Sequence, residues 1–214
     1  MKSAKLLGFV LFLMAFIGCS QQQDNLPFYN TPDFTPVWLQ PGDEGYDKIH
    51  TIPAFNFTDQ LGEPVTNTTT AGKIYVANFF FASCKNVCPA MMDNLEKVQS
   101  AFKNNENVLI LSHSVTPLKD NVPALKKYAN DRHIDNKTWL LLTGDRDATY
   151  ALARRAYFAD EAGGYGKKPD EFLHTENVVL IDTKGRIRGV YNASLAVEID
   201  MLVQDIKLLQ KESA

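Results

Sequence analysis

Apolar residues along the chain follow two spacings in turn, and these spacings predict alternating strands and helices. Three continuous apolar runs are typical of strands buried on both faces of a sheet: 74–81, 108–111 and 139–142. Apolar side chains recur at helical spacing in three further segments, each of which follows one of those runs: 89–102, 122–128 and 148–157. This order predicts parallel strands joined by right-handed crossovers through helices.

Antiparallel pairs are expected on either side of this alternation. Segment 55–66 has apolar residues at every second position before a turn at 59–62, which predicts an N-terminal β-hairpin. Near the C-terminus, strands at 177–181 and 187–191 are joined by a tight turn, and an amphipathic helix over 195–209 follows them. The expected fold is therefore α/β and thioredoxin-like, with a central mixed sheet flanked by helices.

The first residues of the chain have the layout of an export signal. Two lysines precede the apolar run 6–17, which is shorter than the roughly 20 residues of a membrane span. Gly18 stands directly before Cys19, and this arrangement resembles a bacterial lipobox, in which the cysteine is acylated and becomes the mature N-terminus. We therefore expect residues 1–18 to be a signal peptide and Cys19 to carry a lipid. The alternative is a plain secretory signal with an incidental cysteine.

Residues 19–48 are expected to form a tether between the lipid and a domain over 49–214. Four prolines disfavour regular helix in this segment: Pro27, Pro32, Pro36 and Pro41. Large apolar side chains such as Phe28 and Trp38 are unusual in a linker. Part of the segment is therefore expected to pack on the domain surface.

The charge balance excludes one class of partner, and the cysteine count defines one pair. The chain has 214 residues with 22 Lys+Arg against 25 Asp+Glu, a net charge of −3. Removing residues 1–18 takes away two lysines and leaves a net charge of −5. Because nucleic-acid binders normally carry a basic excess, we expect no nucleic-acid partner. Lipidation of Cys19 would leave Cys84 and Cys88 as a pair.

Cys84 and Cys88 lie between the apolar strand 74–81 and the helix opened by Pro89. The first backbone N–H groups of a helix lack internal partners and stabilise a thiolate placed beside them. Three uses of the pair stay open from this spacing alone: a redox-active dithiol, a metal site or a structural disulfide. The metal site needs a third ligand, because two cysteines alone bind copper or zinc poorly.

Four histidines are available as that third ligand. His50 and His133 are expected at the surface, and His113 is expected to be a hydrogen-bonded histidine at the end of a strand. His174 lies just before the strand at 177–181, in a loop that faces the two-cysteine turn in a thioredoxin-like layout. His174 is therefore the best third ligand.

Several motifs resemble the Sco/SenC family of copper chaperones of cytochrome c oxidase assembly. The resemblance covers about residues 50–210 and rests on four features: Cys-x-x-x-Cys-Pro after a Phe-rich strand, Ser114-Val115-Thr116-Pro117, Trp139 before Leu142-Thr143-Gly144-Asp145, and a lone His174 before an apolar strand. It implies that Cys84, Cys88 and His174 bind Cu(I) or Cu(II). The chain departs from the family at Thr116, where an acidic residue is usual, whereas Asp120 matches a later aspartate of the same segment.

The function implied by this resemblance is metallochaperone rather than enzyme. The protein would receive copper from a donor and pass it to the binuclear copper centre of an oxidase subunit, on the periplasmic side of the bacterial envelope. Two thiolates and an imidazole suit Cu(I), and the imidazole also helps to hold Cu(II). Oxidation of Cys84 and Cys88 to a disulfide would release the metal, so a thiol reductant is also an expected partner.

The alternative function is a membrane-anchored thiol–disulfide oxidoreductase. General dithiol exchangers of this fold have two residues between their cysteines and a cis-proline before the facing strand. This chain has three residues between Cys84 and Cys88 and no proline directly before His174.

Overall fold

A computed structural model describes residues 25–159, 172–173 and 175–212, and its centre is a five-stranded mixed sheet. The strands lie in the spatial order β7-β6-β5-β8-β9. Their bounds are β5 Ile74–Phe80, β6 Val108–Ser114, β7 Trp139–Leu142, β8 Asn177–Ile181 and β9 Ile187–Asn192. β5, β6 and β7 are parallel, whereas β8 pairs antiparallel with both β5 and β9. The predicted α/β fold with its antiparallel hairpin at the edge of the sheet is confirmed.

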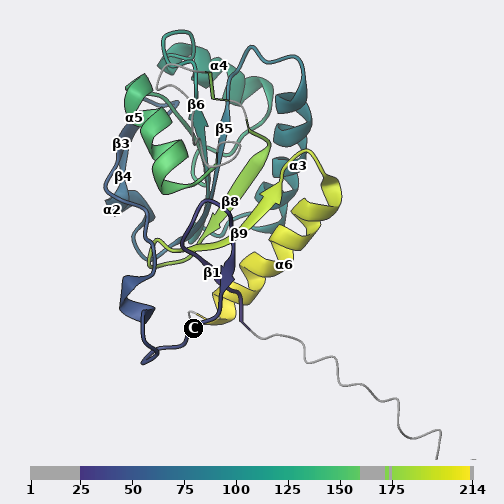
Figure 1. Ribbon diagram of the computed structural model, residues 1–214. Coiled ribbons are helices and arrows are strands. Elements are labelled where there is room, and N and C mark those ends of the chain that lie inside the picture. The colour runs from purple at the N-terminus through teal and green to yellow at the C-terminus, as the bar shows by residue number, and fades with distance from the viewer. Residues whose placement is uncertain (1–24, 160–171, 174, 213–214) are drawn as a thin grey trace, which may run out of the picture.

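Helices cover both faces of this sheet (Figure 1). On one face, α3 (Val87–Ala101), α4 (Val122–Asp131) and α6 (Ala196–Glu212) pack on a core that includes Val76 and Phe80 of β5. On the other face, α5 (Arg146–Ala151) and the π-helix η2 (Leu152–Ala156) pack on a second core that includes Tyr75 and Phe79. Because successive residues of β5 point to opposite faces, its continuous apolar run fills both cores.

Two of the predicted helices differ locally from the expectation. α3 begins at Val87, two residues before Pro89, so that Cys88 lies inside the first turn. The segment predicted as one helix over 148–157 begins at Arg146 as α5 and continues from Leu152 as a π-helix.

The N-terminal hairpin is formed as predicted, from β3 (Asn56–Thr58) and β4 (Pro64–Thr66), and the short helix α2 (Asn67–Thr70) follows it. The buried Gln60 side chain in its turn donates to the carbonyl of Trp139 at 2.9 Å and accepts from the backbone N–H of Leu141 at 2.7 Å. The hairpin therefore occupies the backbone groups along the outer edge of β7, which would otherwise offer an open strand edge.

The described part of the expected tether packs on the domain. It contains two short strands and one turn of 3₁₀-helix: β1 (Phe28–Tyr29), β2 (Pro36–Val37) and η1 (Tyr46–Lys48). The guanidinium of buried Arg188 donates to the carbonyls of Leu26 at 2.6 Å and Pro27 at 3.1 Å, and to the carboxylate of Glu212 at 2.8 Å. These bonds hold the start of the described chain beside the end of α6 (Figure 1).

The expected signal peptide and Cys19 lie outside the described residues. Within the described ranges, none of the helices has the length and apolar character needed to cross a membrane.

Candidate metal centre

The cysteine pair lies where β5 ends and α3 begins. β5 ends at Phe80 and α3 starts at Val87, so Cys84 is in the connecting loop and Cys88 is in the first helical turn. Cys84 is partly exposed, whereas the side chain of Cys88 is buried in the core that α3 packs on. Both residues are free thiols in the structure.

The two thiols hydrogen-bond to each other and have opposite acidities. Burial alone acts to raise the pKa of Cys84, but hydrogen bonds from the Cys88 thiol and from the backbone amides of Asn86, Cys88 and Val87 together lower it. Burial raises the pKa of Cys88 to about 12, and its hydrogen bond to Cys84 adds to that increase. Cys84 is therefore the thiol that ionises first, and Cys88 is its proton-bearing partner.

The backbone of the loop is fixed on the side of β6. The N–H of Val115 donates to the carbonyl of Phe80 at 2.9 Å, which continues the parallel pairing past the end of β5. The N–H of Cys84 then donates to the carbonyl of Phe81 at 3.1 Å and closes a turn. The turn leaves Cys84 beside the start of α3, where the backbone amides of Val87 and Cys88 hydrogen-bond to it.

Phe172 lies beside the cysteine loop and was not singled out from the sequence. Its ring makes an edge contact with the ring of Phe81, with centroids 5.5 Å apart, and 46% of the residue is exposed. The only signal in the sequence was a large apolar side chain next to the predicted ligand. The contact brings residues 172–173 to the loop that leads to Cys84. His174 itself lies outside the described residues.

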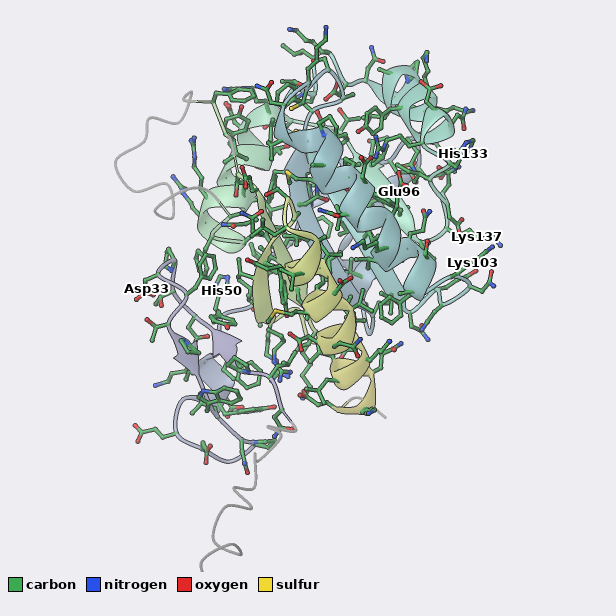
Figure 2. The ribbon with its side chains drawn as sticks, turned by 90° about the vertical axis from the view of Figure 1, so that its right-hand side faces the viewer. Asp33, His50, Glu96, Lys103, His133 and Lys137 are labelled. Atoms are coloured by element: carbon green, nitrogen blue, oxygen red, sulfur yellow. The ribbon has the colours of Figure 1, made fainter. Side chains whose placement is uncertain are left out.

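Among the described residues, neither His50 nor His133 belongs to a group of three or more His, Cys, Asp or Glu side chains that could hold a metal ion. The two histidines lie in different parts of the molecule in Figure 2. His133 is exposed, as expected. His50 is half-buried rather than at the surface, because its Nε2 atom donates to the carbonyl of Ala156 at 2.7 Å and its ring packs on Phe158 with centroids 4.6 Å apart.

The prediction for His113 was correct for its place near the end of a strand and wrong for its hydrogen bond. It is fully buried in β6, and neither ring nitrogen has a hydrogen-bond partner among the described residues. Its ring stacks on Phe79 with centroids 5.2 Å apart and meets the edge of Phe57 at 5.1 Å. Burial lowers the pKa of His113 to about 3, so the ring is neutral at neutral pH. The aromatic residues that surround it come from β3 and β5, which the local pattern around His113 does not reveal.

The described residues thus contain two of the three predicted ligands. Within those residues, no group of three or more His, Cys, Asp or Glu side chains is arranged to hold a metal ion. Cys84 and Cys88 are brought together by their hydrogen bond. Residues 172–173, next to the third predicted ligand, lie against the same loop.

The chain matches the family model described as SCO1/SenC over residues 43–210. It is similar to the SCO1 protein homolog of Bacillus subtilis (strain 168), with 29% identity over 161 residues that cover 73% of this chain and 81% of the relative.

Solved structures agree with this match. The structure of a SCO1/SenC family lipoprotein from Bacillus anthracis str. Ames has a TM-score of 0.65 and 28% identity, and covers 75% of this chain and 95% of its own. BsSco, described with a disulfide switch as a member of the Sco family of cytochrome c oxidase assembly proteins, has a TM-score of 0.65 and 27% identity, with 76% and 95% covered. Copper-bound ScoI from Bradyrhizobium japonicum has the same fold, with a TM-score of 0.57, 23% identity, and 73% and 98% covered. The chain belongs to the SCO1/SenC family.

Proposed function

We propose that this protein is a copper metallochaperone that holds copper at Cys84, Cys88 and His174. The observation that carries the proposal is the paired thiols at the start of α3, one partly exposed with a lowered pKa and one buried with a raised pKa. A metal ion replaces thiol protons when it binds, and two thiolates with one imidazole form a soft site of low coordination number that suits Cu(I). Copper binding by ScoI, a protein of the same fold, supports the choice of metal.

The acceptor in this proposal is the subunit of cytochrome c oxidase that carries the binuclear copper centre. BsSco, which resembles this chain at 27% identity, is a member of a family of cytochrome c oxidase assembly proteins. Partial exposure of Cys84 suits such a transfer, because an incoming ligand can reach the metal on that side while Cys88 remains within the core. In this role the protein needs no catalytic turnover, but it needs a donor that loads it.

Metal binding is coupled to the redox state of the two thiols in this proposal. Forming a bond between the Sγ atoms of Cys84 and Cys88 removes two electrons and two protons, and the resulting disulfide no longer offers thiolate ligands. A thiol reductant is therefore required to restore the copper-binding form. The disulfide switch described for BsSco supports this coupling.

A lipid on Cys19 would tether the domain to a membrane on the periplasmic side of the bacterial envelope. The related B. anthracis protein is a lipoprotein, which supports this placement. Arg188 holds Leu26 and Pro27 near the turn between β8 and β9. Because β8 runs antiparallel to β5, this turn lies at the end of the sheet where β5 begins. The cysteine loop follows the other end of β5. An anchor joined to this segment would therefore leave the copper site directed away from its point of attachment.

Copper titration of the reduced protein tests the proposal. Wild-type protein is expected to bind one Cu(I) ion, and His174→Ala and Cys84→Ser are each expected to lose stoichiometric binding. His133→Asn is the control, because it removes an exposed histidine at a residue with φ of 55°, a conformation that asparagine tolerates. Rapid disulfide exchange with small thiols, without retention of copper, would instead support the oxidoreductase.

A further inference from the structure

Asp120 joins two loops that follow the carboxyl ends of the parallel strands β5 and β6. The cysteine pair lies at the same ends of these strands. Only 3% of the residue is exposed. Its Oδ2 atom accepts three hydrogen bonds, from Ser114 Oγ at 2.6 Å, Thr116 Oγ1 at 2.9 Å and the backbone N–H of Ala82 at 3.2 Å. Ala82 stands two residues before Cys84, so one buried carboxylate connects the end of β6 to the cysteine loop.

The local backbone brings Asp120 into this position. After β6 ends at Ser114, the N–H groups of Lys119 and Asp120 both donate to the carbonyl of Thr116 at 2.9 Å, which forms one helical turn. This turn folds the Asp120 side chain back toward Ser114 and Thr116. The N–H of Ala82 lies two residues beyond the end of β5, and among the described residues no strand pairing continues to that position. The carboxylate provides the acceptor that this partly buried amide needs.

We propose that Asp120 is a positioning residue for the cysteine site. By holding the backbone at Ala82, it keeps the following turn in place, so that the Cys84 sulfur remains over the first amides of α3. Hydrogen bonds to an ionised carboxylate are roughly twice as strong as neutral ones, so this single acceptor restrains the loop effectively. Without it, the loop samples more conformations, and copper binding must then reorder the two thiols.

The inference rests on the proposed function only for the identity of the cargo. The same restraint acts on the metal-free protein, because the bond at Ala82 and the turn that follows it set where the Cys84 sulfur lies relative to Cys88 and to the start of α3. Loosening the loop weakens the contacts that hold the reduced pair in place and shifts the equilibrium toward the disulfide.

The test uses two substitutions that separate shape from charge. Asp120→Asn keeps the shape but removes the charge, whereas Asp120→Glu keeps the charge but displaces the carboxylate by one methylene. Asp145→Asn is the matched control, because Asp145 follows β7 at the same edge of the sheet and its carboxylate caps α5 by accepting from the N–H of Ala148 at 2.7 Å. Thr116→Val is a milder change that removes one of the three donors to Asp120.

Two quantities are measured on each protein: the dithiol-to-disulfide ratio in glutathione buffers without metal, and the Cu(I) affinity by competition with a chromogenic Cu(I) chelator. Both Asp120 variants are expected to lower the Cu(I) affinity by about tenfold or more. They are also expected to shift the ratio toward the disulfide by about fivefold, the factor that corresponds to one ordinary hydrogen bond. Thr116→Val shifts both quantities less in the same direction, and Asp145→Asn shifts neither.

Wild-type values in folded Asp120→Asn and Asp120→Glu proteins would overturn the inference, as would an effect of Asp145→Asn equal to theirs. A loss confined to Asp120→Asn would show that charge acts rather than position. If both Asp120 variants fail to fold, Thr116→Val decides, and wild-type values there reject the positioning role. If wild-type protein retains no copper, the proposed function fails, while the ratio in glutathione buffer still decides the role of Asp120.

Discussion

The Cys88 thiol donates a hydrogen bond to Cys84. Partial burial opposes ionisation of Cys84, but this bond and those from backbone amides together lower its pKa, whereas deeper burial raises the pKa of Cys88 to about 12. The donor stabilises the Cys84 thiolate, while Cys88 keeps its own proton at neutral pH. Cys84 is therefore the thiol that more readily binds a metal or attacks a disulfide. The other becomes a ligand only when something displaces its proton.

Selective alkylation follows from this difference. At pH 7, iodoacetamide is expected to modify Cys84 about tenfold or more faster than Cys88, because the thiolate is the nucleophile and Cys84 is the more accessible residue. Cys88→Ala removes the donor and raises the pKa of Cys84, so Cys84 should react more slowly. Cys88→Ser keeps a hydroxyl donor and should react at a rate closer to wild type. Equal labelling of both cysteines in the folded protein, measured by mass spectrometry of peptides, contradicts the assignment.

Copper affinity is expected to rise with pH. The pKa of Cys88 is about 12, so its proton is bound at pH 7 and must leave when the thiolate ligates copper. Between pH 6 and pH 8, the logarithm of the Cu(I) association constant should therefore increase by about one per pH unit for this proton. Competition with a chelator whose own protonation is known measures the slope. An affinity independent of pH would mean that Cys88 is not a thiolate ligand.

His113 is expected to reduce stability in acid. Its pKa is about 3 in the folded protein against an ordinary value of 6.5, so between these values the unfolded state binds more protons and stability falls as pH falls. At pH 5 the loss is about 2 kcal/mol relative to neutral pH. His113→Phe removes this loss and fills a site already lined by aromatic rings, so its advantage over wild type should grow from pH 7 to pH 5.

Urea unfolding at several pH values measures this effect. His133→Asn is the matched control, because His133 is exposed. The same pH-dependent gain in that variant, or a constant difference for His113→Phe, would show that burial of the His113 ring is not the cause.

Arg188 is expected to hold the N-terminal segment on the domain. Arg188→Met should lower the free energy of unfolding by about 3 kcal/mol, because it leaves carboxylates and carbonyls without their buried partner. Arg188→Lys should recover only part of this loss, since an ammonium lacks the planar fork that reaches Leu26, Pro27 and Glu212 together. Urea unfolding measures stability, and limited proteolysis near residue 27 measures release of the segment. Cu(I) affinity should stay unchanged, and a large decrease would contradict the separation of the two sites.

Local sequence patterns by themselves determined which segments form the strands and helices of the central sheet and where the cysteine pair lies. The runs 74–81 and 108–111 could be recognised because central strands need apolar residues on both faces. Cys84 and Cys88 follow the first of these runs at the point where a helix begins. These features depend on residues that are neighbours in the chain, so period and composition were sufficient. The His174 prediction depends on the loop that approaches the cysteines, and it stays a prediction.

Only the tertiary structure decided which distant residues meet. The amide of Ala82 and the carboxylate of Asp120 are 38 positions apart, and Arg188 reaches Leu26 across 162 positions. His113 was misjudged for the same reason, because the rings of Phe57 and Phe79 enclose it from two other strands. A local pattern shows that a residue is buried, but its hydrogen-bond partners and the rings around it come from segments that only the packed sheet brings together.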